Sequence, residues 1–386
     1  MRVTETRREP LIPVFDLRFT REDLEAVAET LRSGWLTMGP RTQQFEAAFA
    51  HAIGTRHAVA VCSCTAALHL AYLAAGVGPG DEVIVPSYTM VATAAAVLHA
   101  GGTPVFADIV SPSEPLVDPD HVQALLTSRT KAVVAMHFGG YGAAVDRLSR
   151  QCAEHGLALI EDAAHSPMAT LAGRSLGAWG LAGAFSFFSN KVLAVGEGGL
   201  LTTDDDDVAA FARSRRSHAM TAVTWDRHQG TAHHYDVVGL GYNYRIDEPR
   251  AALLLSRMKR LGDEIERRRQ LTRRYRRLLA GVPGLTVPFS DQSVDTSSCY
   301  VMPVMVNDPH RRGPLRSALR QVHGVQTSIF YPAVHEFTAY RQRFPETSLP
   351  QSELAARSEV TLPLFAHMTD SEQDRVVQAL AAELRT

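Results

Sequence analysis

Lysine is scarce in this sequence, and the net charge is small. Of the 39 lysines and arginines among 386 residues, only three are lysines: Lys131, Lys191 and Lys259. Arginine therefore supplies nearly all of the positive charge. The net charge is −2 at pH 7. A chain without an excess of either charge has no long-range field that attracts nucleic acid or an anionic membrane. We therefore expect neither as a partner.

Cysteine is also sparse, and long apolar runs are absent. The four cysteines, Cys62, Cys64, Cys152 and Cys299, form neither a CxxC pair nor a Cys/His zinc pattern, and the chain is much longer than a disulfide-stabilised scaffold. A reducing cytoplasm is the location that we expect. The first 16 residues contain charges but no apolar signal-peptide core, and no apolar run has membrane-spanning length. We expect neither secretion nor membrane insertion.

Short apolar runs alternate with helix-like segments through the first half of the chain. The strand-like runs cover residues 57–63, 81–87, 103–109, 131–138 and 157–163. Strands this apolar, separated by helices, predict a mostly parallel sheet that is covered on both faces. The fold class that we predict is therefore α/β.

The pattern changes after Asn243. Residues 245–282 predict one or two long helices with arginine-rich exposed faces, which we interpret as a connector to a second domain. Beyond them, residues 285–289, 300–306 and 325–332 are strand-like and residues 317–324 are helical, as in a smaller α+β domain. We place a large domain at 12–250 and a small C-terminal domain at 251–386, joined by a long helix near 251–280.

Lys191 has a sequence context unlike that of the other two lysines. It follows the apolar segment AFSFF (184–188) and precedes VLAVGEGG (192–199), whose glycines permit a tight turn and a close approach of the backbone to a ligand. A lysine in apolar surroundings has a lowered pKa and becomes a nucleophile that can form a Schiff base. Taken alone, this segment is explained more simply by a structural lysine at the end of a buried strand.

Two further segments carry polar groups at strand ends. Asp162 and His165 follow the apolar run 157–160, at the carboxyl end of a predicted strand, where open α/β sheets bind ligands. Alternatively, Asp162 caps a helix and His165 is a surface histidine.

The segment VAVCSCTAALHL (59–70) predicts a strand that turns into a helix with small first residues, where backbone N–H groups are open to a phosphate and Thr65 adds a hydroxyl. Thr65 is equally explained as an ordinary N-cap. Pyridoxal phosphate (PLP) needs an amine, a carboxylate for its pyridinium nitrogen and a phosphate site, and these segments supply all three.

The segment 217–239 is rich in histidine and is predicted to be a loop. It contains His218, His228, His233 and His234, but their spacing matches no standard zinc pattern, so we predict no metal site. Loops on a rigid scaffold often carry specificity. Our hypothesis is that this loop reaches the active site of a partner chain, with Trp225 and Arg227 as substrate contacts.

An ordered set of motifs extends over nearly the whole chain. It comprises SCTAALHL (63–70), VPSYTMVATAAAV (85–97), GGTPVFADI (101–109), IEDAAHS (160–166), FSFFSNK (185–191), GEGG (196–199) and GYNYRIDEPRAAL (241–253). It begins near residue 34 and ends with SIFYPAVHEF (328–337) and TLPLFAHMT (361–369). This set resembles the DegT/StrS family of PLP-dependent sugar aminotransferases. The resemblance implies the aspartate-aminotransferase-like fold, with a mostly parallel seven-stranded sheet flanked by helices.

The resemblance also implies roles for individual residues. Lys191 would form the aldimine with PLP and shuttle protons, Asp162 would hold the pyridinium, and His165 would contact the phenolic oxygen of the ring. The phosphate would be bound by Thr65, Ala66 and Ser186, and by Asn243 of a second chain, so the active site would need a homodimer. Tyr331 and His335 would contact the sugar nucleotide.

Two positions depart from the usual family pattern. Cys64 stands where glycine is usual, and because cysteine lacks the freedom of glycine at positive φ, we expect a slightly different turn. Met90 stands where an aromatic residue usually covers the cofactor ring. Methionine sulfur packs favourably on rings, so we expect cofactor binding to be retained with altered stacking. Because Lys191 is present, the family's dehydratase branch, which has histidine there, is not indicated.

The function that we predict is transamination by a cytoplasmic homodimer. Glutamate or glutamine would leave its amino group on PLP, and a nucleotide-linked keto-sugar would accept it, giving an amino sugar for an antibiotic or a surface polysaccharide. A keto-cyclitol of an aminoglycoside-type pathway is an alternative acceptor. A non-catalytic regulator that binds PLP is a rival hypothesis, against which the presence of Lys191, Asp162, Thr65 and Ser186 argues.

Overall fold

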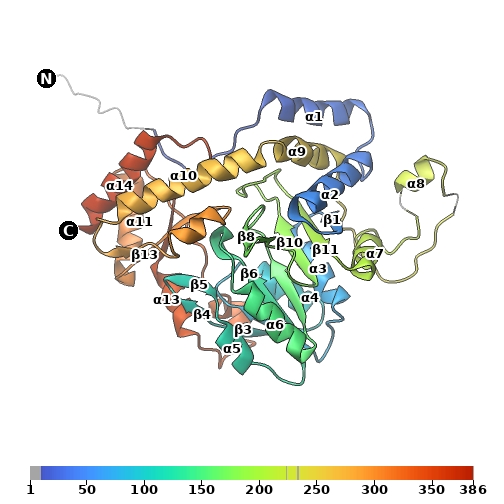
Figure 1. The fold of residues 1–386 in the computed structure, drawn as a ribbon, viewed down its shortest axis with the longest axis horizontal. Helices are drawn as coiled ribbons and strands as arrows, with labels where there is room; N and C mark the ends of the chain where they lie inside the picture. Colours follow the sequence, from blue (N-terminus) through green and yellow to red (C-terminus); the bar gives the residue numbers. More distant parts are fainter. Residues whose placement is uncertain (1–9, 223, 233, 386) are drawn as a thin grey trace.

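A seven-stranded sheet forms the centre of the chain (Figure 1). The computed structural model describes residues 10–222, 224–232 and 234–385. The strand order is β1–β11–β10–β7–β6–β2–β3, and only the pairings that involve β11 are antiparallel. The strands are β1 (His57–Val61), β2 (Glu82–Pro86), β3 (Thr103–Ala107), β6 (Thr130–Met136), β7 (Ala158–Asp162), β10 (Ala182–Ser186) and β11 (Gly199–Thr203). The prediction of a mostly parallel α/β sheet is confirmed.

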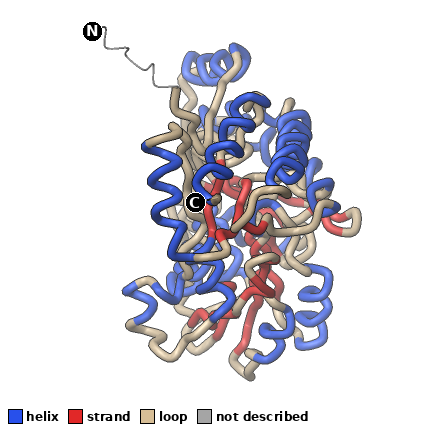
Figure 2. The backbone as a smooth tube through the Cα atoms, turned by 90° about the vertical axis from the view of Figure 1, so that its left-hand side faces the viewer, coloured by secondary structure: helices blue, strands red, loops and turns tan. Residues whose placement is uncertain are grey.

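Both faces of this sheet are covered, which explains why its strands are apolar throughout. In β1, Ala58 and Ala60 pack in one core cluster while Val59 and Val61 pack in another, because successive side chains of a strand point to opposite faces. Figure 2 shows helices on both sides of the strands. The helices of this part are α1 (Arg21–Arg32), α2 (Pro40–Ile53), α3 (Cys64–Ala74), α4 (Ala92–His99), α5 (Pro119–Ala124), α6 (Val145–His155), α7 (Asp206–Arg215) and α8 (Thr224–His228).

Two helices lead to the C-terminal part. Helix α9 (Glu248–Met258) begins where the Asp247 side chain accepts the N–H of Arg250, and α10 (Leu261–Leu279) follows after a bend. In Figure 1, α10 runs from α9 to the C-terminal elements. These comprise β12 (Leu285–Thr286), β13 (Met302–Val306), β14 (Glu359–Leu362), α11 (Arg312–Gln321), α12 (Thr338–Arg341), α13 (Pro350–Ser358) and α14 (Asp370–Leu384). The strands β13 and β14 and the helices α11 and α14 pack around a third core cluster, whereas α12 and α13 pack against the clusters of the large sheet.

The domain boundaries remain a prediction. Ile12 exchanges backbone hydrogen bonds with Gly324 and Gln326, at 2.9 Å each, and packs in the C-terminal core cluster. Helix α9 contacts α1 and α2 on the large part. We propose that the large unit ends near the bend between α9 and α10, and that the first described residues pack with the small unit.

The small sheet differs from the sequence prediction in one strand. Its order is β12–β13–β14, and residues 325–332, which we predicted as a strand, contribute only isolated bridges. The backbone groups of Phe330 explain this, because its N–H donates to the Glu359 carboxylate at 2.8 Å and its carbonyl accepts from the Tyr88 hydroxyl. Because side chains already bond the N–H and the carbonyl of Phe330, this segment cannot form continuous backbone hydrogen bonds with a neighbouring strand at that point.

Short ribbons and turns complete the described structure. The ribbons pair β4 (Ile109–Ser111) with β5 (Glu114–Val117) and β8 (Thr170–Leu171) with β9 (Arg174–Ser175). Single 3₁₀ turns cover Phe138–Gly140, Gln292–Asp295, Pro309–Arg311 and Val334–Glu336. Among the described residues, no helix has both the length and the apolar character that crossing a membrane requires.

Candidate active site

A cavity of about 380 Å³ lies at the carboxyl ends of the central strands. Its wall includes Met136 at the end of β6, Asp162 at the end of β7 and Ser186 at the end of β10. The C-terminal part supplies Tyr300 and residues 328–331. Parallel strands therefore bring segments that are far apart in the sequence to one edge of the sheet, and the C-terminal part covers that edge.

Lys191 lies in this cavity and is 9% exposed. Burial lowers the pKa of Lys191 to about 8, although the nearby Cys64 and Asp162 oppose the shift. Its ammonium nitrogen lies 4.4 Å from the centre of the Tyr300 ring, a cation–π contact. Sequence reasoning missed Tyr300, because nothing in the segment 300–306 marks it except strand character.

The lowered pKa of Lys191 can be measured directly. With a pKa of about 8, about a tenth of the amine is neutral at pH 7, roughly 300 times the fraction for an unperturbed lysine. Since the chain has only three lysines, lysine labelled with ¹³C at Cε gives few signals, and Lys191→Arg identifies one of them. In the cofactor-free protein we expect that signal to titrate with a midpoint near pH 8; a midpoint above pH 10 would contradict the burial argument.

Asp162 is a buried carboxylate that faces the same cavity. It accepts a hydrogen bond from Thr93 Oγ1 at 2.7 Å and one from the N–H of Ala164 at 3.2 Å. Burial raises the pKa of Asp162, because these two bonds and the charge of Lys191 compensate only in part for lost hydration. None of the residues that the structure describes forms a salt bridge with Asp162.

The neighbouring Glu161 has a different role. It is fully buried on the other side of β7 and accepts the N–H groups of Gly177, Trp179 and Gly180 at 2.6–3.0 Å. The His137 ring contacts the same carboxylate at 3.0 Å. Glu161 therefore organises a loop behind the sheet, while Asp162 is left for the cavity, as the alternation of side chains along a strand requires.

His165 is held as one neutral tautomer. The N–H of Gly139 donates to His165 Nδ1 at 3.2 Å, so the ring proton is assigned to Nε2. His165 Nε2 lies 2.9 Å from the Tyr331 hydroxyl. Burial lowers the pKa of His165 well below its ordinary value, and the charge of Lys191 adds to this effect. His165 therefore presents a hydrogen-bond donor to the Tyr331 oxygen.

The N-terminus of α3 borders the cavity through Ser63, Cys64 and Thr65. The N-cap is Ser63, whose hydroxyl accepts the N–H of Ala66 at 3.2 Å, so Thr65 is not the cap. Cys64 is the first helical residue and does not have a positive φ, so its conformation is open to any side chain. Gly199 packs so closely on Ser63 and Cys64 that a Cβ there would overlap their backbone.

Comparison with known proteins decides the family. Residues 18–381 match the model of the DegT/DnrJ/EryC1/StrS aminotransferase family. The spore coat polysaccharide biosynthesis protein SpsC of Bacillus subtilis is 40% identical over 368 residues, which cover 93% of this chain and 94% of SpsC. The chain belongs to this aminotransferase family.

Solved members of the aminotransferase family have the same fold. DesV of S. venezuelae, in complex with a ketimine intermediate, is 35% identical with a TM-score of 0.90, covering 98% of this chain and 100% of DesV. DesI, in the presence of its TDP-sugar product, is 34% identical with a TM-score of 0.86, covering 97% and 92%. NtdA of Bacillus subtilis, with bound pyridoxamine phosphate, is 27% identical with a TM-score of 0.87, covering 100% and 87%.

The residues of this aminotransferase fit the same cofactor. Asp162, a buried carboxylate without an ion pair among the described residues, suits a pyridinium cation. Lys191, a buried amine with a lowered pKa, suits the cofactor aldehyde. The open N-terminus of α3 suits a phosphate. Asp162, Lys191 and Thr65 all line one cavity. The chain is a PLP-dependent aminotransferase.

The aminotransferase does not bring every predicted residue to its cavity. His335 does not line the cavity, because its ring is held by Ser87 Oγ at 2.7 Å and Glu353 at 3.3 Å, and its contact with the sugar nucleotide stays a prediction. Ala66 is buried behind the first turn of α3 and does not reach the wall. Met90, His165, Ser186 and Tyr331 do line the cavity.

The residues predicted to serve a partner chain lie outside the cavity of their own chain. Trp225 packs against Trp35 with ring centres 4.8 Å apart, and Arg227 stacks on Tyr235 at 4.5 Å. Asn243 is also absent from the cavity wall. Of the four histidines in this region, His233 lies outside the described residues. Among the described residues, no group of three or more acidic, histidine or cysteine side chains is arranged to hold a metal ion.

Proposed function

We propose that this enzyme transfers an amino group from glutamate or glutamine to a nucleotide-linked keto-sugar. The observation that carries the proposal is the meeting of Lys191 and Asp162 beside the N-terminus of α3 in one cavity. The sugar part of the proposal is supported by the relatives, since DesI is described with a TDP-sugar product and SpsC belongs to polysaccharide biosynthesis. An amino sugar for a surface polysaccharide or an antibiotic is the product class that we infer.

The residues around the reacting centre have separate roles in this proposal. Asp162 would pair with the pyridinium nitrogen, and the neutral His165 would turn its Nε2–H from the Tyr331 hydroxyl to the phenolic oxygen when the cofactor is bound. The cofactor, when bound, supplies an electron sink for the substrate carbanion. Lys191 takes a proton from the substrate carbon and returns it, a task suited to an amine with a pKa of about 8. Tyr300 keeps the free ammonium on its ring face, 4.4 Å away.

The phosphate and the substrate are assigned to the rim of the cavity. Thr65, Ser186 and the first N–H groups of α3 would bind the phosphate, and Met90, which is 49% exposed, would pack on the ring. Ala66 contributes at most its backbone, because its side chain is buried. Tyr331 contacts the sugar nucleotide.

We propose further that a second copy of the chain completes each site. Asn243 of the second copy would reach the phosphate, and Trp225 and Arg227 of the second copy would contact the substrate. Helix α8 lies at the right-hand edge of Figure 1, and the rings of its Trp225 and His228 pack on Trp35. Val238 and Leu240, which follow α8, are 65% and 89% exposed in the single chain, as expected for an arm that packs on another protein.

A mixing experiment tests the shared site. Lys191→Ala and Asn243→Ala subunits, unfolded and refolded together, should regain about a quarter of the wild-type activity, because half of the random dimers then contain one site with both native residues. The control mixes Lys191→Ala with Asp162→Asn, two residues of the same chain's cavity, and should stay inactive. A site built from one chain would give no recovery in either mixture.

The reaction itself is tested by spectroscopy and by acceptors. The absorption band of the cofactor-bound enzyme should change to that of the pyridoxamine form on addition of glutamate or glutamine, and a panel of TDP-, UDP- and GDP-linked keto-sugars should restore it. Recovery only with a keto-cyclitol would replace the acceptor class. A band that no amino donor changes would overturn transamination and favour the PLP-binding regulator.

A further inference from the structure

The loop that follows Lys191 is closed by two backbone hydrogen bonds. The N–H of Lys191 donates to the carbonyl of Phe188 at 2.8 Å, and the N–H of Val195 donates to the carbonyl of Phe187 at 2.9 Å. Val192 and Ala194, between them, are buried. Their carbonyl groups need partners other than water, because a buried carbonyl without a hydrogen bond is costly.

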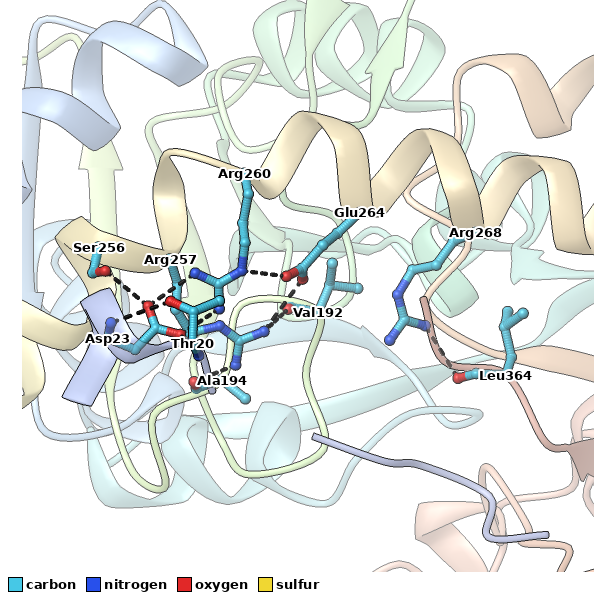
Figure 3. A network of polar contacts seen from close by, with 10 residues as sticks. All are labelled: Thr20, Asp23, Val192, Ala194, Ser256, Arg257, Arg260, Glu264, Arg268 and Leu364. Atoms are coloured by element: carbon cyan, nitrogen blue, oxygen red, sulfur yellow. Dashed lines mark hydrogen bonds and ion pairs between the residues drawn. The ribbon is translucent and has the colours of Figure 1, made fainter. Parts of the chain in front are cut away.

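Arg257 supplies those partners. Its Nη1 donates to the carbonyl of Ala194 at 2.8 Å, and its Nη2 donates to the carbonyl of Val192 at 3.3 Å (Figure 3). The Arg257 side chain is only 4% exposed. A planar guanidinium with donors at fixed angles spans two carbonyls of one loop, which a lysine ammonium cannot do in the same geometry.

The guanidinium of Arg257 is itself held by one acidic partner, Glu264. Its Nη2 lies 3.3 Å from Glu264, and Glu264 also accepts from Arg260 Nε at 2.8 Å. Arg260 forms two hydrogen bonds with the fully buried Asp23, at 2.6 and 2.8 Å. The bend between α9 and α10 places Arg257, Arg260 and Glu264 side by side, as Figure 3 shows.

This network of hydrogen bonds and ion pairs connects three separate segments of the chain. Asp23 accepts the N–H of Thr20 at 2.9 Å in the capping box of α1, so the network ties the start of α1 to the α9–α10 bend and to the loop of Lys191. Arg257 is not part of the wall of the cavity at Lys191. Arg257 can therefore act on the reaction only through the backbone of residues 192–194.

We propose that Arg257 is a positioning residue for Lys191, fixing the loop 192–194 so that the amine enters the cavity at one place. The inference rests on the proposed role of Lys191 in catalysis. The loss of both guanidinium donors would leave two buried carbonyls unpaired and let the loop shift, and a shift of about 1 Å at a reacting group costs on the order of 100-fold in rate.

The test uses matched variants at two arginines. Arg257→Met keeps the length of the side chain but removes its donors, and Arg257→Lys restores a charge and part of the hydrogen bonding. Arg274→Met is the control, because Arg274 is a partly buried arginine of α10 that pairs with Asp374 at 2.8 Å but does not contact the loop. All variants are compared by circular dichroism and thermal unfolding before further measurement.

Two readouts need no amino acceptor. In the cofactor-free protein, amide exchange of peptides covering residues 187–196 should accelerate by at least about tenfold in Arg257→Met, and remain as in wild type in Arg274→Met. The rate at which added PLP is captured by Lys191, followed by its absorption band and by borohydride trapping, should fall in the same variant. Arg257→Lys should lie between the two. These readouts decide the inference even if the keto-sugar proves to be the wrong acceptor.

With the cofactor and both substrates present, kcat of Arg257→Met should fall by roughly 10- to 100-fold while KM changes little, the pattern of a misplaced reacting group. Wild-type exchange and capture rates in folded Arg257→Met would overturn the proposal, as would equal losses in Arg274→Met. If Arg257→Met does not fold, Arg257→Gln takes its place under the same criteria.

Discussion

Replacement of Lys191 by alanine should lower the rate of transamination by at least about 10⁴-fold, since the variant loses both the nucleophile that binds the cofactor and the base that moves the substrate proton. The lost group is the primary amine in the cavity wall, buried next to Asp162 and Tyr300. The measurement is a single-turnover assay with glutamate, followed by the absorption of the cofactor. The variant should still fold, because the removal of a buried amine with a lowered pKa removes an unfavourable burial.

The chain offers unusually clean controls for this experiment. Lys131→Ala and Lys259→Ala remove the only other lysines, and both should keep wild-type rates. The triple comparison shows whether one particular amine, rather than lysine in general, reacts with PLP. Full activity of Lys191→Ala, or equal loss in either control, would contradict the assignment of Lys191.

Replacement of Asp162 by asparagine should lower kcat by at least about 100-fold, a typical effect of removing one preorganised charge from an active site. Without the carboxylate, the pyridinium nitrogen loses the partner that keeps it protonated. The cofactor-free variant should be within about 1 kcal/mol of wild type in unfolding free energy, because surroundings that raise the pKa of Asp162 disfavour its charged form in the folded state.

Glu161→Gln provides the contrast, one residue away. Its carboxylate accepts three backbone N–H groups and contacts His137, so the variant should lose about 1–3 kcal/mol of unfolding free energy. Its kcat, measured where the protein is folded, should fall far less than that of Asp162→Asn. Chemical denaturation and steady-state kinetics of both variants decide the matter. If Asp162→Asn were instead the less stable and the more active of the two, their assigned roles would have to be exchanged.

The sequence was informative where a local signal also met the requirement of its place in the fold. The apolar runs at 57–63, 81–87, 103–109, 131–138 and 157–163 became β1, β2, β3, β6 and β7, because a strand buried on both faces must be apolar throughout. Residues 325–332 were equally strand-like and did not form one. There the partners of Phe330 are the side chains of Tyr88 and Glu359, and no local pattern indicates that distant side chains will take the backbone groups.

Of the residues predicted for the candidate site, some line the cavity and others do not. Asp162, His165, Ser186 and Lys191 were predicted, and all four line the cavity, because residues at the carboxyl ends of parallel strands meet at one edge of the sheet. His335 was predicted as well, but Ser87 and Glu353 hold its ring elsewhere. Which of several polar residues in a matching segment faces the ligand depends on neighbours that are not adjacent in sequence.

By itself, the sequence determined the fold class, the family resemblance and the lysine on which the chemistry depends, since these are properties of periodicity and of short motifs. Only the tertiary structure decided the protonation and the hydrogen-bond partners of the residues at the site. Burial lowers the pKa of Lys191, Gly139 selects the tautomer of His165, and Arg257 reaches the loop of Lys191 from a helix more than sixty positions along the chain. The physical reason is that desolvation and hydrogen bonding act over a few ångströms in space, and folding alone brings these residues within that range.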